Sequence, residues 1–271
     1  MFEERLHASS IFRFRNLSDQ GGVNHFVSTR IGGSSLPPYE SLNLGFHVGD
    51  SLETVLKNRE RLATTVKIPL YDFALAKQIH SGAVTIVTEQ MKGRGADDHD
   101  TAVEATDAMV TSVPGLCLAV LTADCVPVLL FDPRKRVVAA VHAGWRGSVK
   151  LIARKTVEIL QQEFKCQPTD ILAGIGPSIG PCHYEIGPDV ISQVKDAFGG
   201  TADYINDQSA DGKGYFDLWE ANKRQIMDAG VPPQNIEIAR ICTYCNAHLF
   251  FSVRHQKGRT GRFGTGIMLS T

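Results

Sequence analysis

Three short segments each end an apolar run on a side chain that binds transition metals. They are Gln78-Ile79-His80, Thr122-Ala123-Asp124-Cys125, and Val141-His142, which precedes Ala143-Gly144-Trp145-Arg146-Gly147. Two imidazoles and one thiolate are borderline-soft ligands that together select zinc, with copper as the second choice. Three protein ligands also leave a fourth position open for water or substrate, as catalytic zinc sites do. We therefore expect a metalloenzyme with about one zinc ion per chain at His80, Cys125 and His142, provided that the three segments meet in the fold.

The neighbours of Cys125 set it apart from a buried structural cysteine. Asp124 is a costly charge in an otherwise apolar stretch, and Pro127 is expected to break the following strand. A charge and a chain break suit the rim of an active site better than a core. The same pattern leaves a second interpretation open, in which Cys125 is the nucleophile of a cysteine hydrolase and His142 is its base.

The segment that follows His142 is predicted to bind an anion. It stands between an apolar strand and a helix expected from Ser148 to about Phe164. Free backbone N–H groups at the start of that helix and the Arg146 guanidinium would together hold a phosphate or a carboxylate. Arg59 and Arg254 are further candidates for the same anion.

A glycine-rich segment, residues 174–187, also follows a predicted strand. Its G-x-G-x-x-x-G spacing, with prolines at 177 and 181, misses the dinucleotide-binding fingerprint. The prolines remove two backbone donors, so a rigid loop that lines a pocket is the better interpretation.

A rival metal signature pairs His183-Tyr184-Glu185 with Cys242-Thr243-Tyr244-Cys245, in imitation of the H-x-E…C-x-x-C of zinc nucleobase deaminases. Ile241 stands where that signature has proline, and the gap between its two halves is long. A redox C-x-x-C is a further possibility, although no thioredoxin-like βαβ pattern leads into it. We predict that the Cys242/Cys245 pair is neither a disulfide nor the principal metal site.

Composition excludes several classes of protein. The 271 residues carry a formal net charge of −1, with 43% hydrophobic and 21% charged residues, which gives no electrostatic case for nucleic acid or an acidic membrane surface. No apolar run approaches the roughly 20 residues of a membrane span. The start, Met1-Phe2-Glu3-Glu4-Arg5, lacks the order of a signal peptide, and the six cysteines are expected as free thiols or ligands. A cytoplasmic protein is expected.

Strands and helices are predicted to alternate in one mixed α/β domain without a linker. A capping box at Asp50-Ser51-Leu52-Glu53 begins an amphipathic helix, and the polar residues 93–107 form a surface loop. A hairpin turn at residues 132–135 joins two of the apolar strands. Strands are expected at 84–88, 116–121, 126–131, 137–141, 171–175, 236–241 and 249–253, and further helices begin at Ser148, Pro188 and Asp217 and end near Phe164, Gly199 and Gly230.

Taken together, these motifs resemble the YfiH (laccase-domain) family over nearly the whole chain. The resemblance is carried by Asn43-Leu44-Gly45, His47-Val48-Gly49-Asp50, Gln78-Ile79-His80, Asp107-Ala108-Met109-Val110, Thr122-Ala123-Asp124-Cys125, His142 to Gly147, Gly174-Ile175-Gly176-Pro177, Cys242-Thr243, Phe250 to Arg254 and Thr260-Gly261-Arg262. It implies a single α/β (α+β) domain over residues 1–271, with mixed β-sheets sandwiched between helices. It also implies zinc held by His80, Cys125 and His142.

The activity that the resemblance implies is phosphorolysis of adenosine, inosine and methylthioadenosine, together with deamination of adenosine. The expected partners are these nucleosides and phosphate, bound by Asn43, Arg59, Arg146 and Arg254, and the expected state is a monomer. An older polyphenol-oxidase (laccase) label also attaches to the family. A multicopper oxidase needs repeated His-x-His pairs, and none of the nine histidines lies two positions from another, so the copper interpretation is weak.

Overall fold

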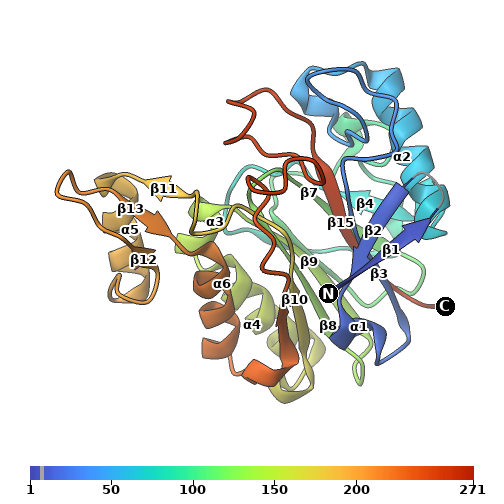
Figure 1. The fold of residues 1–271 in the computed structure, drawn as a ribbon. Helices are drawn as coiled ribbons and strands as arrows, with labels where there is room; N and C mark the ends of the chain where they lie inside the picture. Colours follow the sequence, from blue (N-terminus) through green and yellow to red (C-terminus); the bar gives the residue numbers. More distant parts are fainter. Residues whose placement is uncertain (7–8) are drawn as a thin grey trace.

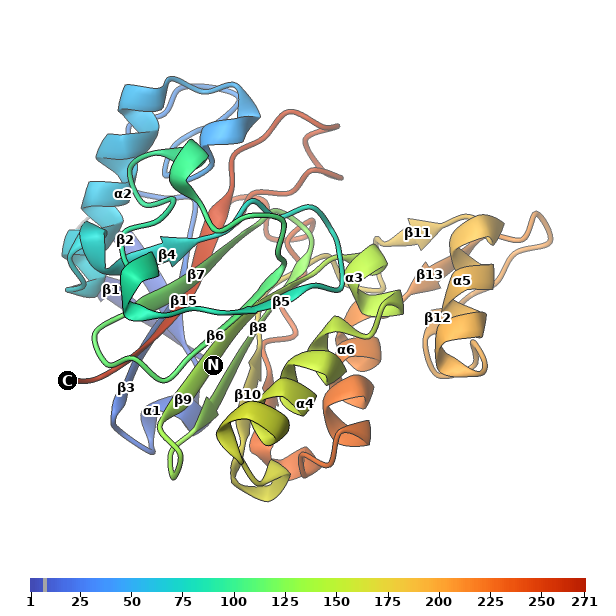
Figure 2. The same cartoon turned by 180° about the vertical axis from the view of Figure 1, so that it is seen from behind.

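The computed structural model describes residues 1–6 and 9–271, and most of their strands form two six-stranded sheets (Figure 1). The two sheets share a buried core, and helices cover the outer face of each (Figure 2). The fold is thus mixed α+β with mixed sheets between helices, as predicted. None of the helices in the described part of the chain combines the length and the apolar character needed to cross a membrane.

The first sheet is antiparallel except for one parallel pair, β4 with β7. Its strands, in spatial order, are β1 (Phe2–Leu6), β2 (Ser9–Arg13), β3 (Val23–Ser28), β15 (Phe263–Leu269), β7 (Cys117–Thr122) and β4 (Phe73–Leu75). Strand β15 was not predicted from the sequence, because Gly264 and Gly266 interrupt its apolar pattern. A Cβ on Gly266 would lie 2.6 Å from the Phe26 ring, so the ring of the neighbouring strand occupies the space of a side chain there.

The second sheet contains the predicted hairpin. In spatial order its strands are β14 (Ile236–Ile238), β10 (Leu172–Ile175), β8 (Val126–Asp132), β9 (Val137–Ala143), β6 (Ala108–Thr111) and β5 (Val84–Ile86). Asp132 closes the turn between β8 and β9, because its carboxylate accepts hydrogen bonds from the backbone N–H groups of Arg134 and Lys135 at 2.8 and 2.9 Å.

Apart from Asp132 and His142, strands β8 and β9 are apolar along their length, because both of their faces are buried. Val126, Val128 and Leu130 face the helices on one side, whereas Leu129 and Phe131 face the first sheet. Successive side chains of a strand point to opposite faces, so a two-sided core requires this continuous apolar run. Both ends of β8 and β9 are thereby fixed, including the end that carries Cys125 and His142.

Helices α4 and α6 cover the second sheet, and α2 covers the first (Figures 1 and 2). The helices are α1 (Arg15–Ser18), α2 (Leu52–Val66), α3 (Trp145–Val149), α4 (Ile152–Phe164), α5 (Pro188–Phe198) and α6 (Leu218–Asp228). Short 3-10 turns are η1 (Phe46–Val48), η2 (Leu70–Asp72), η3 (Glu89–Met91), η4 (His99–Thr101), η5 (Pro168–Asp170) and η6 (Pro233–Asn235). Helix α5 and a small sheet of β11 (Glu185–Ile186), β13 (Gly214–Phe216) and β12 (Ile205–Asn206) project from the body (Figure 1).

Capping side chains fix the starts of two predicted helices. Asp217 caps α6, and its carboxylate accepts from Glu220 N at 3.0 Å, as the capping box predicts. The cap of α2 is Ser51 rather than Asp50, because the Asp50 carboxylate is directed to Ser35 and Asn43 instead.

The helix expected at residues 148–164 is broken in two. Leu151 adopts a left-handed conformation (φ 60°) between α3 and α4. Gln225 of α6 occupies the break: its amide nitrogen donates to Ser148 O at 3.1 Å, and its amide oxygen accepts from Ala153 N at 3.2 Å. A partner from a distant helix thus satisfies the backbone groups that the break leaves open.

Two further expectations were wrong, and a third was right only in part. Residues 249–253 are not a strand; Phe250 and Phe251 are apolar because a folded loop buries them between other core residues. Pro127 does not break the chain but lies inside β8, opposite His142. The loop at residues 93–107 is only partly on the surface, since Val103 and Asp107 are buried.

Candidate active site with a metal-binding trio

The three predicted ligands come together although they lie on different elements. His80 lies in the loop between β4 and β5, Cys125 in the turn between β7 and β8, and His142 near the end of β9. One nitrogen of each histidine and the Cys125 sulfur all lie within 4.8 Å of one another. His80 Nε2 is 3.8 Å from Cys125 Sγ, and the two imidazole rings meet edge to face at 4.8 Å between centroids. We call these residues the trio.

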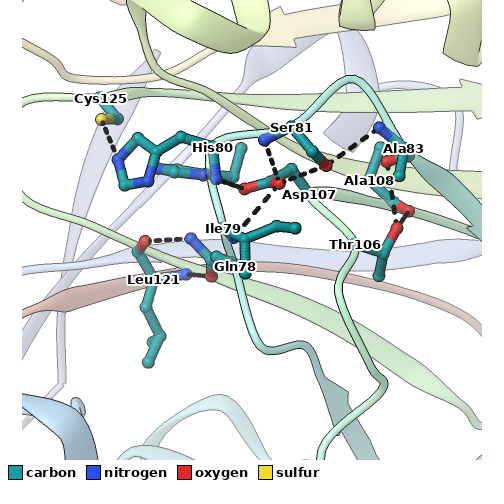
Figure 3. A network of polar contacts seen from close by, with 11 residues as sticks. Gln78, Ile79, His80, Ser81, Ala83, Thr106, Asp107, Ala108, Leu121 and Cys125 are labelled. Carbon is teal, nitrogen blue, oxygen red and sulfur yellow. Dashed lines mark hydrogen bonds and ion pairs between the residues drawn. The ribbon is translucent and has the colours of Figure 1, made fainter.

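A buried carboxylate, Asp107, positions two members of the trio. Figure 3 shows its contacts with His80 and Ser81. Its Oδ1 accepts from His142 Nδ1 at 2.8 Å and from His80 N at 3.0 Å. Its Oδ2 accepts from the Ser81 backbone and hydroxyl at 2.6 and 2.7 Å. Because His142 Nδ1 is taken up by Asp107, Nε2 is the nitrogen left for a metal or a proton.

No role for Asp107 was predicted from the sequence, although its position carries a signal. An aspartate directly before the buried run Ala108-Met109-Val110 needs a partner, because an unpaired charge is too costly in a core. Nothing in one sequence says which distant group is that partner, and the structure identifies it as His142 together with the 79–81 loop.

The charges of the trio and Asp107 depend on one another. Burial raises the pKa of the Cys125 thiol, but His142 and His80 lower it to about 6. Burial lowers the pKa of His142, whereas Cys125 and Asp107 raise it to about 9. Burial also raises the pKa of Asp107, yet hydrogen bonds from His142 and Ser81 bring it down to about 2. A thiolate therefore stands ready at neutral pH, as a metal ligand or a nucleophile requires.

Gly144, directly after β9, leaves the trio room to converge. A Cβ at this position would lie 2.9 Å from Cys125 Sγ and 3.0 Å from His80 Cδ2. The first contact is shorter than real side chains make and the second is tighter than most of them, so the close approach of Cys125 and His80 favours glycine here.

Replacing Asp107 with asparagine should weaken metal binding at the trio by about ten- to a hundredfold, the usual cost of losing a carboxylate that orients a ligating histidine. Chelator competition on the purified variant measures this affinity. Asp132→Asn is the matched control, because Asp132 is equally buried but holds the β8–β9 turn. An equal loss of metal affinity in both variants would mean that Asp107 affects metal binding only by stabilising the fold.

The trio forms part of the wall of a cavity of about 880 Å³. Five basic residues and one carboxylate, Asp124, line the cavity, although the whole chain is nearly neutral. Asp124 is already engaged, because its two oxygens accept from Thr243 Oγ1 and Arg254 N, each at 2.7 Å. The surplus of positive charge suits an anionic substrate. The basic residues of the lining are Arg59, Lys77, Arg254, Lys257 and Arg262.

Two of the predicted anion ligands, Arg59 and Arg254, lie in the cavity wall. Arg59 is buried and donates to the carbonyls of Leu44 and Ala96, both at 2.8 Å, so its guanidinium also holds two loops together. Arg254 is exposed to the cavity, and its guanidinium donates to Glu185 O at 3.2 Å. Arg254 is thus the better placed of the two to meet a substrate.

The other two predicted ligands lie elsewhere. Arg146 is on the surface in α3, outside the cavity lining, with its guanidinium 4.4 Å from the centre of the Trp145 ring. The assignment of Arg146 to the anion site assumed that a long helix begins beside it, but the structure has the five-residue helix α3 there. Asn43 is fully buried, and its amide oxygen accepts from Arg262 N at 2.9 Å. Asn43 therefore supports the loop of Arg262, a cavity residue to which the sequence analysis gave no role.

The glycine-rich loop lines the cavity, as predicted. Ile179 and Tyr184 both belong to the cavity wall. Two backbone hydrogen bonds tie the loop to the trio's surroundings, since Gly176 N donates to Pro127 O at 2.8 Å and Ile179 N donates to Asp124 O at 2.9 Å.

Comparison with known proteins identifies the family. Residues 24–270 match the model of a family described as multi-copper polyphenol oxidoreductase laccase. A purine nucleoside phosphorylase of Bacteroides thetaiotaomicron is 36% identical over 257 residues, which cover 94% of this chain and 95% of the relative. The chain belongs to the laccase-domain family.

Two further relatives also match over nearly the whole chain. The crystal structure of YlmD from Geobacillus stearothermophilus superposes with a TM-score of 0.94 at 34% identity, covering 100% of this chain and 99% of that one. A protein named adenosine deaminase RL5, from an unknown prokaryotic organism, is 36% identical over 246 residues, with 91% of this chain and 94% of the relative covered.

Proposed function

We propose that this laccase-domain protein is a zinc-dependent purine nucleoside phosphorylase that also deaminates adenosine. The observation that carries the proposal is the trio in the wall of a cavity rich in basic side chains. Relatives that match nearly the whole chain are named purine nucleoside phosphorylase and adenosine deaminase, which supports both reactions. The proposed substrates are adenosine, inosine and methylthioadenosine, with phosphate as the second substrate of phosphorolysis.

The donor set fits a zinc ion. Two imidazole nitrogens and a thiolate converge, and Asp107 fixes the tautomer that leaves His142 Nε2 free to bind. Copper(II) binds nitrogen ligands more tightly but is the second choice for this set. When bound, zinc would supply a Lewis acid beside the substrate.

The protein's own residues divide the remaining work. In phosphorolysis a phosphate oxygen attacks the ribose C1′, the C1′–N9 bond breaks, and the purine leaves with the bonding electron pair and gains a proton. We assign phosphate binding to Arg254 and Arg262, whose charges in the cavity wall oppose that of phosphate. Ile179 and Tyr184 provide an apolar wall for the base. In deamination water replaces the amino group at C6, and phosphate has no part.

One assay tests the proposed function. Purified protein is incubated with inosine or with adenosine, with and without phosphate, and free base, ribose 1-phosphate and ammonia are measured. Inosine should release hypoxanthine only when phosphate is present, whereas adenosine should release ammonia in either case. Base release without phosphate would indicate a hydrolase, and no turnover of any nucleoside would indicate a binding protein.

A second candidate, a cysteine hydrolase, is favoured by two observations. The low pKa of Cys125 and the His142–Asp107 hydrogen bond also describe a nucleophile, a base and the group that orients the base. His80 decides between the two, because a catalytic dyad has no need of it whereas a metal site does. Retention of activity in His80→Ala, in protein that elemental analysis shows to be free of metal, would favour the hydrolase.

A further inference from the structure

A second group of metal-binding side chains lies where two loops meet, apart from the residues that line the cavity. Cys182 and His183 lie within the glycine-rich loop, and Cys242 and Cys245 follow β14. One ligand atom from each of the four lies within 4.8 Å of the other three. We call these four residues the Cys₃His cluster. None of the six cysteines forms a disulfide in the structure.

The contacts within the Cys₃His cluster converge on one small volume. His183 Nδ1 is 3.2 Å from Cys182 Sγ and 3.3 Å from Cys245 Sγ. The sulfurs of Cys182 and Cys245 are 3.8 Å apart. The fourth ligand, Cys242, is buried, and its sulfur accepts the backbone N–H of Gly180 at 3.3 Å. Such an N–H bond stabilises a thiolate, the form that binds metal.

Backbone hydrogen bonds hold the two ligand-bearing loops together around the cluster. Ser178 and Cys242 form a parallel bridge, and Thr243 N donates to Ser178 O at 3.0 Å. His183 N donates to Gly180 O at 3.0 Å, and the His183 ring stacks on Tyr244 with 4.1 Å between centroids. The ligands are therefore presented by a frame that the protein chain itself maintains.

We propose that the Cys₃His cluster binds a structural zinc ion, distinct from the metal of the trio. Three thiolates and one imidazole are an established ligand set for closed, tetrahedral zinc. The trio, by contrast, offers three ligands and an open position. The two sites thus differ in the number of protein ligands, four against three, and this number separates structural from catalytic zinc sites.

The same four ligands exclude a nucleobase-deaminase centre at this position. A deaminase would use His183, Cys242 and Cys245 and leave the fourth position to water, with a glutamate acting on that water. Here Cys182 takes the fourth position. Glu185, the residue in the place of the catalytic glutamate, is exposed and lies 3.6 Å from Lys213. The rival signature noticed in the sequence is thus part of a structural site.

The proposed zinc ion joins two segments of the cavity wall. Tyr184 is adjacent to the cluster residue His183, and the carbonyl of His183 accepts from the Arg254 guanidinium at 3.3 Å. Thr243, adjacent to Cys242, donates to Asp124 beside the trio. Losing the ion should loosen the loops that carry Tyr184 and Arg254, and faster hydrogen–deuterium exchange at residues 180–185 and 242–254 should report this.

Elemental analysis of full-length protein, purified with a reductant, tests the proposal. We expect about two zinc ions per chain in the wild type and about one in the Cys182→Ser/Cys245→Ser variant. Cys125→Ala should also retain about one ion, and the combination of both changes none. Cys166→Ala removes a buried thiol remote from both sites and should keep both ions. In cobalt-substituted protein, the thiolate-to-cobalt charge-transfer absorption should fall mainly in the Cys182→Ser/Cys245→Ser variant.

A measurement on the wild type keeps the proposal testable if that variant does not fold. The exposed thiols of Cys182 and Cys245 should resist alkylation in zinc-loaded protein and react rapidly after chelation, as peptide mapping would show. Equal reactivity in the two states contradicts the proposal, and so does a wild type with about one zinc that Cys125→Ala removes. A Cys182–Cys245 disulfide in the reduced preparation would overturn it as well. None of these results depends on nucleoside turnover.

Discussion

Replacing Cys125 with alanine should abolish both phosphorolysis and deamination and remove the metal of the trio. Two neutral imidazoles lack the negative charge that a thiolate contributes, so they hold zinc poorly. We expect both rates to fall by more than about a hundredfold. Losing a group that only hydrogen-bonds to a metal ligand already lowers affinity or activity by up to about that factor, and Cys125 is itself a ligand. Paired assays with inosine and adenosine, together with elemental analysis, measure the two effects on one preparation.

Two further variants make this result interpretable. Cys166→Ala controls for the loss of a buried thiol and should keep both activities. The His80→Ala variant should lose both the metal and the activity, as Cys125→Ala does, because His80 serves only as a metal ligand in the proposed mechanism. Full activity in the Cys125→Ala variant would mean that neither a metal at the trio nor a cysteine nucleophile takes part in the reaction.

Replacing Arg254 with alanine should weaken the phosphate-dependent reaction more than deamination. The loss of one charge-assisted phosphate contact costs about 1.5–3 kcal/mol, which corresponds to roughly a ten- to hundredfold lower rate. Deamination uses water as its nucleophile and should change less. A phosphate titration with inosine, set beside ammonia release from adenosine, separates the two effects.

Arg146→Ala is the matched control, because the sequence analysis ranked Arg146 first and the structure places it on the surface outside the cavity lining. We expect it to change either rate little. If Arg146→Ala lowered phosphorolysis more than Arg254→Ala did, the phosphate site would lie beside α3 after all. An equal loss of both reactions in Arg254→Ala would assign this arginine to holding the 183–185 loop, whose carbonyls its guanidinium contacts.

Several residues of the candidate site were predictable from the sequence. His80, Cys125 and His142 could be proposed as a set because each ends an apolar run with a metal-binding side chain, and strand ends are where a buried sheet can present such groups. The β8–β9 hairpin was predictable as well, since its two-sided core requires a continuous apolar run on either side of a polar turn. These features depend on local pattern alone.

Features that depend on distant partners were not predictable. The break at Leu151 requires Gln225, more than one helix away, to bind the exposed backbone groups. Phe250 and Phe251 resemble a strand in their apolarity, and only the packing of a loop against both sheets explains their burial. The prediction that Arg146 binds phosphate rested on one uninterrupted helix; the structure has a break there, and the assignment itself stays a prediction.

By itself the sequence determined the class of fold and singled out the three side chains of the trio as candidate metal ligands, because apolar periodicity and side-chain type are properties of short segments. Only the tertiary structure decided which charges meet. It paired Asp107 with His142, gathered Arg59, Arg254 and Arg262 around one cavity, and completed the Cys242/Cys245 pair with Cys182 and His183. These groups lie far apart along the chain, and the packing of the two sheets and their connecting loops fixes the distances between them.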